Sequence, residues 1–115
     1  MEFNANETEP ILKEWQESGD TIAFYRVGIG VSVAFAGKVF PTTPGVWAVG
    51  SRSMGSSFDL KRTICRFGEM TVPNVLQDLV GAESASGIEL VLETGEQCFL
   101  WRVPRTKTLT PDNPL

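Results

Sequence analysis

The chain contains two cysteines, Cys65 and Cys98, and no histidine. Without histidine, a Ser-His-Asp or Cys-His nucleophile, a histidine general base and a histidine-ligated metal site cannot form within one chain. Two thiolates alone cannot complete a four-ligand zinc site. Both cysteines fall in segments predicted to be core strands, where a thiol is usually a buried structural residue. We therefore predict no catalytic residue, no metal site and no cofactor.

Three carboxylates, Glu89, Glu93 and Glu96, lie on or beside one predicted hairpin. Paired carboxylates can perform acid–base chemistry when a cleft shifts one of their pKa values. An outward strand face beside a turn is usually only solvated. We expect the solvated arrangement for all three.

Two arginines stand four residues apart in the segment Arg62-Thr63-Ile64-Cys65-Arg66. This spacing resembles the RxxxR element of PilZ domains, and the resemblance covers these five residues. In that family the element helps to bind a cyclic dinucleotide on a small β-barrel, so the resemblance implies ligand contacts by Arg62 and Arg66. The second element of the family, Asp/Asn-x-Ser-x-x-Gly further along the chain, has no match here.

Large aromatic side chains could line a ligand pocket, stack on bases or anchor a partner. Trp47 and Trp101 lie in predicted strands, and Arg102 and Arg105 are the basic residues near the second ring. Aromatic platforms for nucleic acid usually have more basic flanks, and core packing is the alternative for both rings. The candidate ligand or partner contacts are Trp47, Arg62, Arg66, Trp101 and Arg102.

Composition and charge restrict the class of protein. The 115 residues are 42% hydrophobic and 21% charged, which is typical of a globular chain of one domain. The formal net charge of −4 disfavours nucleic acid as a partner. Residues 1–7 lack the features of a signal peptide, and the longest apolar stretch, 27–37, is too short to cross a bilayer. These features predict a cytoplasmic protein with reduced thiols and no membrane contact.

The elements that position these residues follow from the spacing of apolar side chains. A helix is predicted from a capping box of Asn6 and Glu9, with Pro10 in its first turn, to Gly19. A second helix is predicted over 72–80. Alternating patterns predict strands at 22–24, 29–36, 46–49, 57–67, 88–92 and 98–103, the last one apolar on both faces. We expect turns at 37–38, 41–45, 53–55 and 94–96, a loop at 82–87, and a bulge or bend near 61–63.

These elements predict a mainly β (α+β) fold. We expect a small bent antiparallel sheet or partly open barrel of about six strands, with an N-terminal helix and one short helix before the last hairpin. This layout is similar to that of Sm-like and other SH3-like barrels, although the Sm signature motifs are absent. The predicted organisation is a polar lead-in (1–6), a single β-rich domain (7–104) and a flexible tail (105–115).

Fold alone does not fix function. The leading hypothesis is a non-enzymatic interaction module that associates with itself or another protein through a strand edge or apolar face. The second is a small-ligand or nucleotide-binding barrel with Arg62 and Arg66 at its mouth. The third is an Sm-like nucleic-acid binder, which the acidic charge disfavours.

Overall fold

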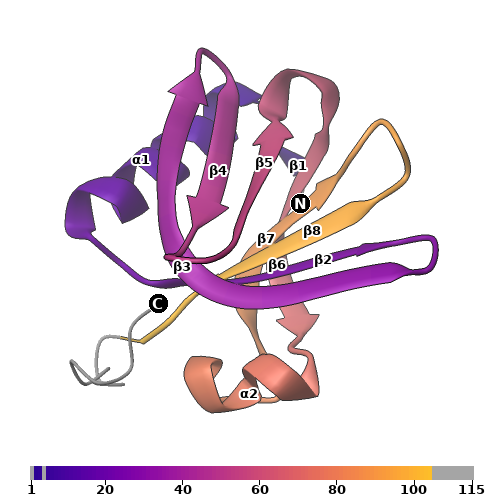
Figure 1. Cartoon of the computed structure of the whole chain (residues 1–115). Helices are drawn as coiled ribbons and strands as arrows, with labels where there is room; N and C mark the ends of the chain where they lie inside the picture. The colour runs from indigo at the N-terminus through magenta and orange to yellow at the C-terminus, as the bar shows by residue number, and fades with distance from the viewer. Residues whose placement is uncertain (1, 4, 105–115) are drawn as a thin grey trace.

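One antiparallel sheet dominates the structure, a computed structural model that describes residues 2–3 and 5–104 (Figure 1). Within these residues the strand order is β1-β6-β7-β8-β2-β3-β4-β5, and no ladder joins β1 to β5, so the sheet is open. The strands are β1 (Glu2–Phe3), β2 (Ile22–Gly28), β3 (Val31–Thr43), β4 (Val46–Gly50), β5 (Gly55–Asp59), β6 (Ile64–Thr71), β7 (Ser84–Val91) and β8 (Gln97–Arg102). The predicted fold class is confirmed, with eight strands in place of about six.

Helix α1 (Ala5–Ser18) packs against β3, β1 and the 3-10 turn Leu60–Arg62, and so joins elements from both ends of the strand order. It begins before Asn6, so the predicted capping box is wrong and Pro10 lies inside the helix. Leu12 and Trp15 are buried on its inner side and hold it to the sheet. Its end at Gly19, with φ of 69°, agrees with the prediction.

Strand β3 is the corner of the sheet. Its first half pairs with β2 as far as Gly37, and its second half pairs with β4 from Lys38 onward. Figure 1 shows the strong curvature of β3 between these two halves. The turn predicted at 37–38 is therefore wrong, because both residues lie within β3. Glycine is needed at position 37 for a different reason: a Cβ there would overlap the carbonyl of Gly50. The chain reverses after Thr43, within the turn expected at 41–45.

The segment 57–67 forms two strands where one bent strand was predicted. β5 lies at one end of the sheet order and β6 near the other, with the 3-10 turn between them. The Asp59 carboxylate accepts the amide of Lys61, and the amide of Leu60 donates to the Gly45 carbonyl. The break falls at the place predicted for a bend, but it sends the chain to the far side of the sheet.

The second half of the domain agrees more closely with expectation. Helix α2 (Asn74–Val80) follows Pro73 and ends at Gly81, whose φ is 83°. The β7–β8 hairpin turns at Gly95 as predicted. The loop predicted at 82–87 is wrong from Ser84 onward, because these small residues extend β7. At Gly87 a side chain would collide with the indole of Trp101 and the carbonyl of Leu100, so the small residue permits close packing.

Two apolar clusters lie on opposite faces of the sheet. The inner cluster lies between the curved sheet and α1, and includes Phe24, Trp47, Phe58, Cys98 and Leu100. The outer cluster lies between the sheet and α2, and includes Leu76 and Trp101. Alternate residues of β8 enter each cluster, which confirms a last strand that is apolar on both faces.

The ends of the chain differ from the predicted organisation only in part. Residues 1–6, expected as a polar lead-in, include β1 and the start of α1. β1 pairs with β6 through Glu2 and Phe3. The tail predicted at 105–115 lies outside the described residues.

Candidate functional site

Both candidate tryptophans lie in the core. Trp47 is 2% exposed and Trp101 is 1% exposed. The Trp47 indole donates to the Glu9 carboxylate at 2.9 Å, and the Trp101 indole donates to the Ala85 carbonyl at 3.2 Å. Each polar tip therefore has a partner within the chain, and neither ring is available to a ligand.

The two arginines of the PilZ-like element pair with different carboxylates. Arg62 ends the 3-10 turn and is paired with Glu93 at 3.8 Å, whereas Arg66 is on β6 and pairs with Glu89 at 3.7 Å. Arg102, the third candidate arginine, is paired with Asp20 at 3.7 Å. Each guanidinium thus has its own carboxylate, and the five candidate residues do not converge on one site.

The carboxylates of the last hairpin are each paired with a different arginine. Glu93 is exposed, as expected for a solvated residue. Glu89 is largely buried and also accepts the Gln97 side-chain amide at 2.8 Å, so the solvated arrangement expected for this residue is wrong. Glu96 bonds to Arg26, a residue that the alternating pattern places on the inner face of β2 with Ile22 and Phe24.

The two thiols lie on one row of the sheet without meeting. Cys65 and Cys98 each pair with Leu90, from opposite sides of β7. Two strand spacings separate them by about 9–10 Å, which exceeds the reach of a disulfide. Burial raises the pKa of the Cys98 thiol to about 11, so this side chain is protonated at neutral pH.

The polar centre of the molecule is Arg26. Its Nη2 and Nε donate to the two carboxylate oxygens of Glu96 at 3.0 and 3.2 Å. Its Nη1 donates to the hydroxyl of Ser56 at 2.8 Å and to the carbonyl of Ser57 at 3.1 Å. One side chain therefore ties β2 to the base of the β7–β8 turn and to β5. The hydrogen bond from Arg26 lowers the pKa of the Glu96 carboxyl, with a further contribution from the hydroxyl of Thr94.

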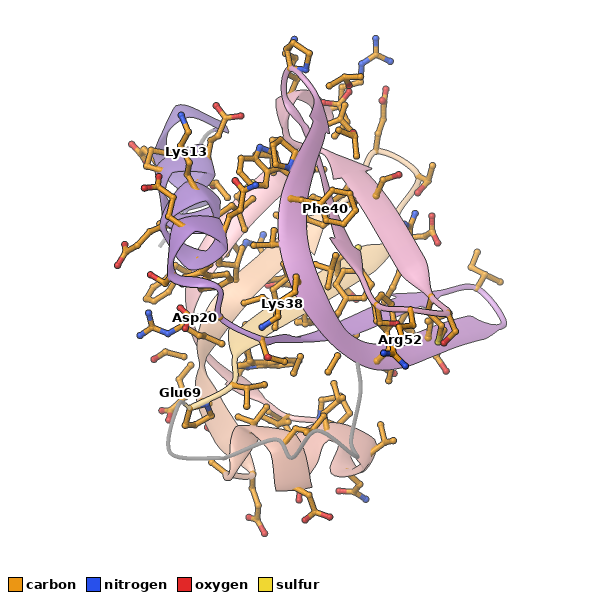
Figure 2. All side chains as sticks on the ribbon, turned by 60° about the vertical axis from the view of Figure 1, so that its left-hand side comes forward. Lys13, Asp20, Lys38, Phe40, Arg52 and Glu69 are labelled. Carbon is orange, nitrogen blue, oxygen red and sulfur yellow. The ribbon has the colours of Figure 1, made fainter. Side chains whose placement is uncertain are left out.

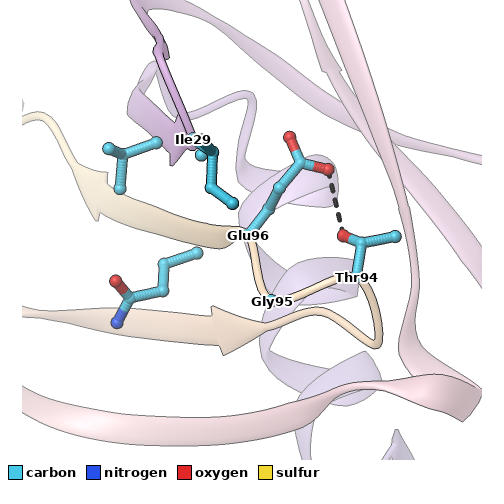
Figure 3. Close-up of a pocket in the computed structure, with 7 residues that line it drawn as sticks. Ile29, Thr94, Gly95 and Glu96 are labelled. Carbon is cyan, nitrogen blue, oxygen red and sulfur yellow. Dashed lines mark hydrogen bonds between the residues drawn. The ribbon is translucent and has the colours of Figure 1, made fainter.

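A hollow of about 230 Å³ adjoins this ion pair at the tips of the two hairpins. Figure 3 shows it between the β2–β3 turn and the β7–β8 turn, with the Thr94 hydroxyl bonded to Glu96. Gly28 makes room for the Glu96 side chain, since a Cβ there would lie 3.0 Å from the Glu96 Cγ. Ile29, at the turn, is fully exposed.

A second hollow, of about 200 Å³, lies between β5 and the end of β7. Its lining includes Ser57, Phe58 and Asp59 of β5, and Leu92, Glu93 and Thr94 beyond β7. Arg26, Arg62 and Thr63 complete it, and no β4 residue contributes. The hollow therefore adjoins the edge of β5 that faces away from β4.

The outer face of the β3–β4–β5 region carries exposed apolar side chains. Phe40 and Met54 are each 41% exposed. A Cβ at Gly50 would lie 3.0 Å from the Phe40 ring and 3.8 Å from the Met54 carbonyl, so both residues border Gly50, Met54 through its main chain. Figure 2 shows the Phe40 ring over the outside of the β3 ribbon. We call Phe40, Gly50 and Met54 the apolar patch.

Other functional signals are few. Within residues 2–3 and 5–104, no group of three metal-ligating side chains gathers in one place. The described helices include none with the length and hydropathy to cross a membrane. No known protein family, curated protein or solved structure matches the chain.

Sequence reasoning missed Arg26, Phe40 and the edge of β5. Arg26 had a signal, because a charged residue on the inward phase of an apolar strand requires a partner. The unpaired edge of β5 had no signal in the sequence, because the break between β5 and β6 depends on long-range pairing.

Proposed function

We propose that this chain is a non-enzymatic protein-interaction module that associates with itself or with another protein. The observation that carries the proposal is the apolar patch, because Phe40 and Met54 are large, exposed apolar residues that both border Gly50. Exposed apolar groups that adjoin one another are typical of protein-binding surfaces.

The pairing of the charged side chains on the open side of the sheet supports a non-enzymatic role. Arg26 and Glu96 satisfy each other, and Arg62 pairs with Glu93. The chain has no histidine to act as a base, and the raised pKa keeps the Cys98 thiol protonated at neutral pH. We also propose a cytoplasmic location, which suits two thiols that cannot pair with each other.

A ligand-binding barrel is the second candidate, and the two hollows are the spaces that it would use. Their volumes of about 200 and 230 Å³ are below the range of roughly 300–1,000 Å³ that holds small-molecule ligands. A nucleotide needs more room and unpaired cations. The nucleic-acid alternative ranks lower still, because the net charge is −4 and Arg62, Arg66 and Arg102 each lie beside a carboxylate.

The test combines molecular mass with site-specific crosslinking. Light scattering after size exclusion should give a defined oligomer for a self-associating chain, and Phe40→Ser should return it to a monomer. For a different partner, a photocrosslinking amino acid at position 40 should give a discrete adduct in the source cells, whereas the same group at exposed Lys13 on α1 should not. A monomer with no adduct specific to position 40 would contradict the proposed function.

A further inference from the structure

Strand β5 has one unpaired edge in the described part of the chain, since it ends the strand order. The Ser57 carbonyl accepts from Arg26 and therefore points away from β4. Because the N–H and C=O of one strand residue share a side and alternate along the strand, Gly55, Ser57 and Asp59 present their main-chain groups to this edge. An edge of this kind is a template for an added strand.

The hollow of about 200 Å³ lies directly beside that edge. Its apolar wall is formed by Phe58 and Leu92, which pack in or against the inner cluster. A strand added to an edge directs every second side chain to one face of the sheet. One such side chain, opposite the middle of β5, would enter this hollow.

The charges around the hollow indicate what that side chain is. Two arginines and two acidic residues line it, so the formal charges cancel. Arg26 is bound by Glu96, Arg62 lies beside Glu93, and Asp59 accepts the Lys61 amide. A neutral, internally paired lining complements an uncharged apolar side chain, whereas a charged one would lose its hydration without gaining a partner.

A second copy of β5 does not provide this side chain. The residues of β5 on its inner face are Ser56 and Phe58. Phe58 is buried in its own inner cluster, and the Ser56 hydroxyl accepts from Arg26. Neither can reach the hollow of another molecule without leaving its own core.

We infer that the edge of β5 and the adjoining hollow bind an extended segment of a different protein, which adds as a strand and inserts one apolar side chain. This inference rests on the proposed function and names its partner chemistry. The added strand donates an amide to the Ser57 carbonyl in place of Arg26, while Arg26 retains Glu96 and the Ser56 hydroxyl. Main-chain bonds supply affinity and the hollow supplies specificity, as in other strand-addition complexes.

The probe is a display library of random heptapeptides, selected on the whole protein. Selected peptides should share an apolar residue at one position, and its change to aspartate should weaken binding at least tenfold. On binding, the amides of Gly55, Ser57 and Asp59 should become protected from hydrogen exchange. The amides of Ser56 and Phe58, already paired with β4, should change little.

The matched variants are Ser57→Pro, which removes one edge amide, and Ser57→Ala, which keeps it. Ser57→Pro should weaken binding at least tenfold and Ser57→Ala less than threefold, with thermal unfolding recorded for both. Exchange protection in the unmodified protein keeps the test valid if the proline variant does not fold. Selected peptides whose binding depends on Phe40, and which leave the β5 amides unprotected from exchange, would overturn the strand-addition site. The same result would support the proposed interaction module. A selection that enriches no peptide would also overturn the site, and the crosslinking at position 40 would then decide the module separately.

Discussion

The guanidinium of Arg26 and the carboxylate of Glu96 form a two-point ion pair between residues 70 positions apart in the sequence. The same guanidinium continues to the hydroxyl of Ser56 and the carbonyl of Ser57. Arg26 therefore connects β2 to the β7–β8 turn and to β5, a strand that shares no ladder with β2, on the open side of the sheet. Its first role is structural, because nearly all of its donors have partners within the chain.

Replacing Arg26 with methionine should lower the free energy of unfolding by about 1–2 kcal/mol, since four hydrogen bonds of a partly exposed group are lost. Urea unfolding followed by tryptophan fluorescence measures the change. Arg52→Met, in the exposed loop between β4 and β5, is the control and should change stability by less than about 0.5 kcal/mol. Equal effects of the two substitutions would contradict the structural role of Arg26.

The stability of the protein should depend on Glu96 in mild acid. Its carboxyl pKa is lowered by the hydrogen bond from Arg26, so the stabilisation is fully present above the unfolded-state pKa. It is lost as pH falls through the lower pKa of the folded state. Thermal unfolding between pH 6 and pH 2.5 should show a shallower loss for Glu96→Gln than for the unmodified protein. Glu14→Gln makes the same charge change on the exposed side of α1, and its stability should fall with pH as steeply as that of the unmodified protein.

The thiols should remain free and unreactive in the folded protein. Cys65 and Cys98 are buried and lie about two strand spacings apart, so oxidation with diamide should yield no internal disulfide by mass. Because the Cys98 pKa is raised to about 11, the contribution of this thiol to stability is constant below the unfolded-state value of 9.0 and is lost as pH rises toward 11. A Cys98→Ala variant should lose this alkaline dependence. Rapid labelling of both thiols at pH 8 without denaturant would contradict the buried placement.

The corner of the sheet gives a steric test. Gly37→Ala should destabilise the protein by about 1–3 kcal/mol, because the added methyl group overlaps the backbone of Gly50. Gly68→Ala is the matched control, since no atom lies within 4 Å of the new Cβ and its φ is not positive. Thermal unfolding compares the two variants, and similar midpoints would argue against the close approach of β3 and β4.

Local patterns predicted much of the fold. The α2 pattern with its Pro73 and Gly81 boundaries, and the β7–β8 hairpin around Gly95, depend on contacts within a few residues. Long-range packing decided the rest. Gly37 resembles a turn residue in sequence but serves an approach to Gly50, and Ser84–Gly87 resemble a loop but fit beneath Trp101.

The candidate site was predicted less well, for a related reason. Trp47 and Trp101 are conspicuous in the sequence, but burial removes them from any surface. The strand-addition site consists mainly of backbone atoms of β5, whose exposure depends on which strands pair with which. Composition and spacing contain no information on an unpaired edge that only the complete topology creates.

The position of β8 has a consequence for how the protein is made. This strand supplies Cys98 and Leu100 to the inner cluster and Trp101 to the outer one, and it separates β2 from β7 in the sheet. It is also the last described strand to leave the ribosome. Until residue 103 has emerged, β2 and β7 each lack a neighbour and both clusters are incomplete. Most of the described domain must therefore leave the ribosome before these few late residues complete both clusters at once.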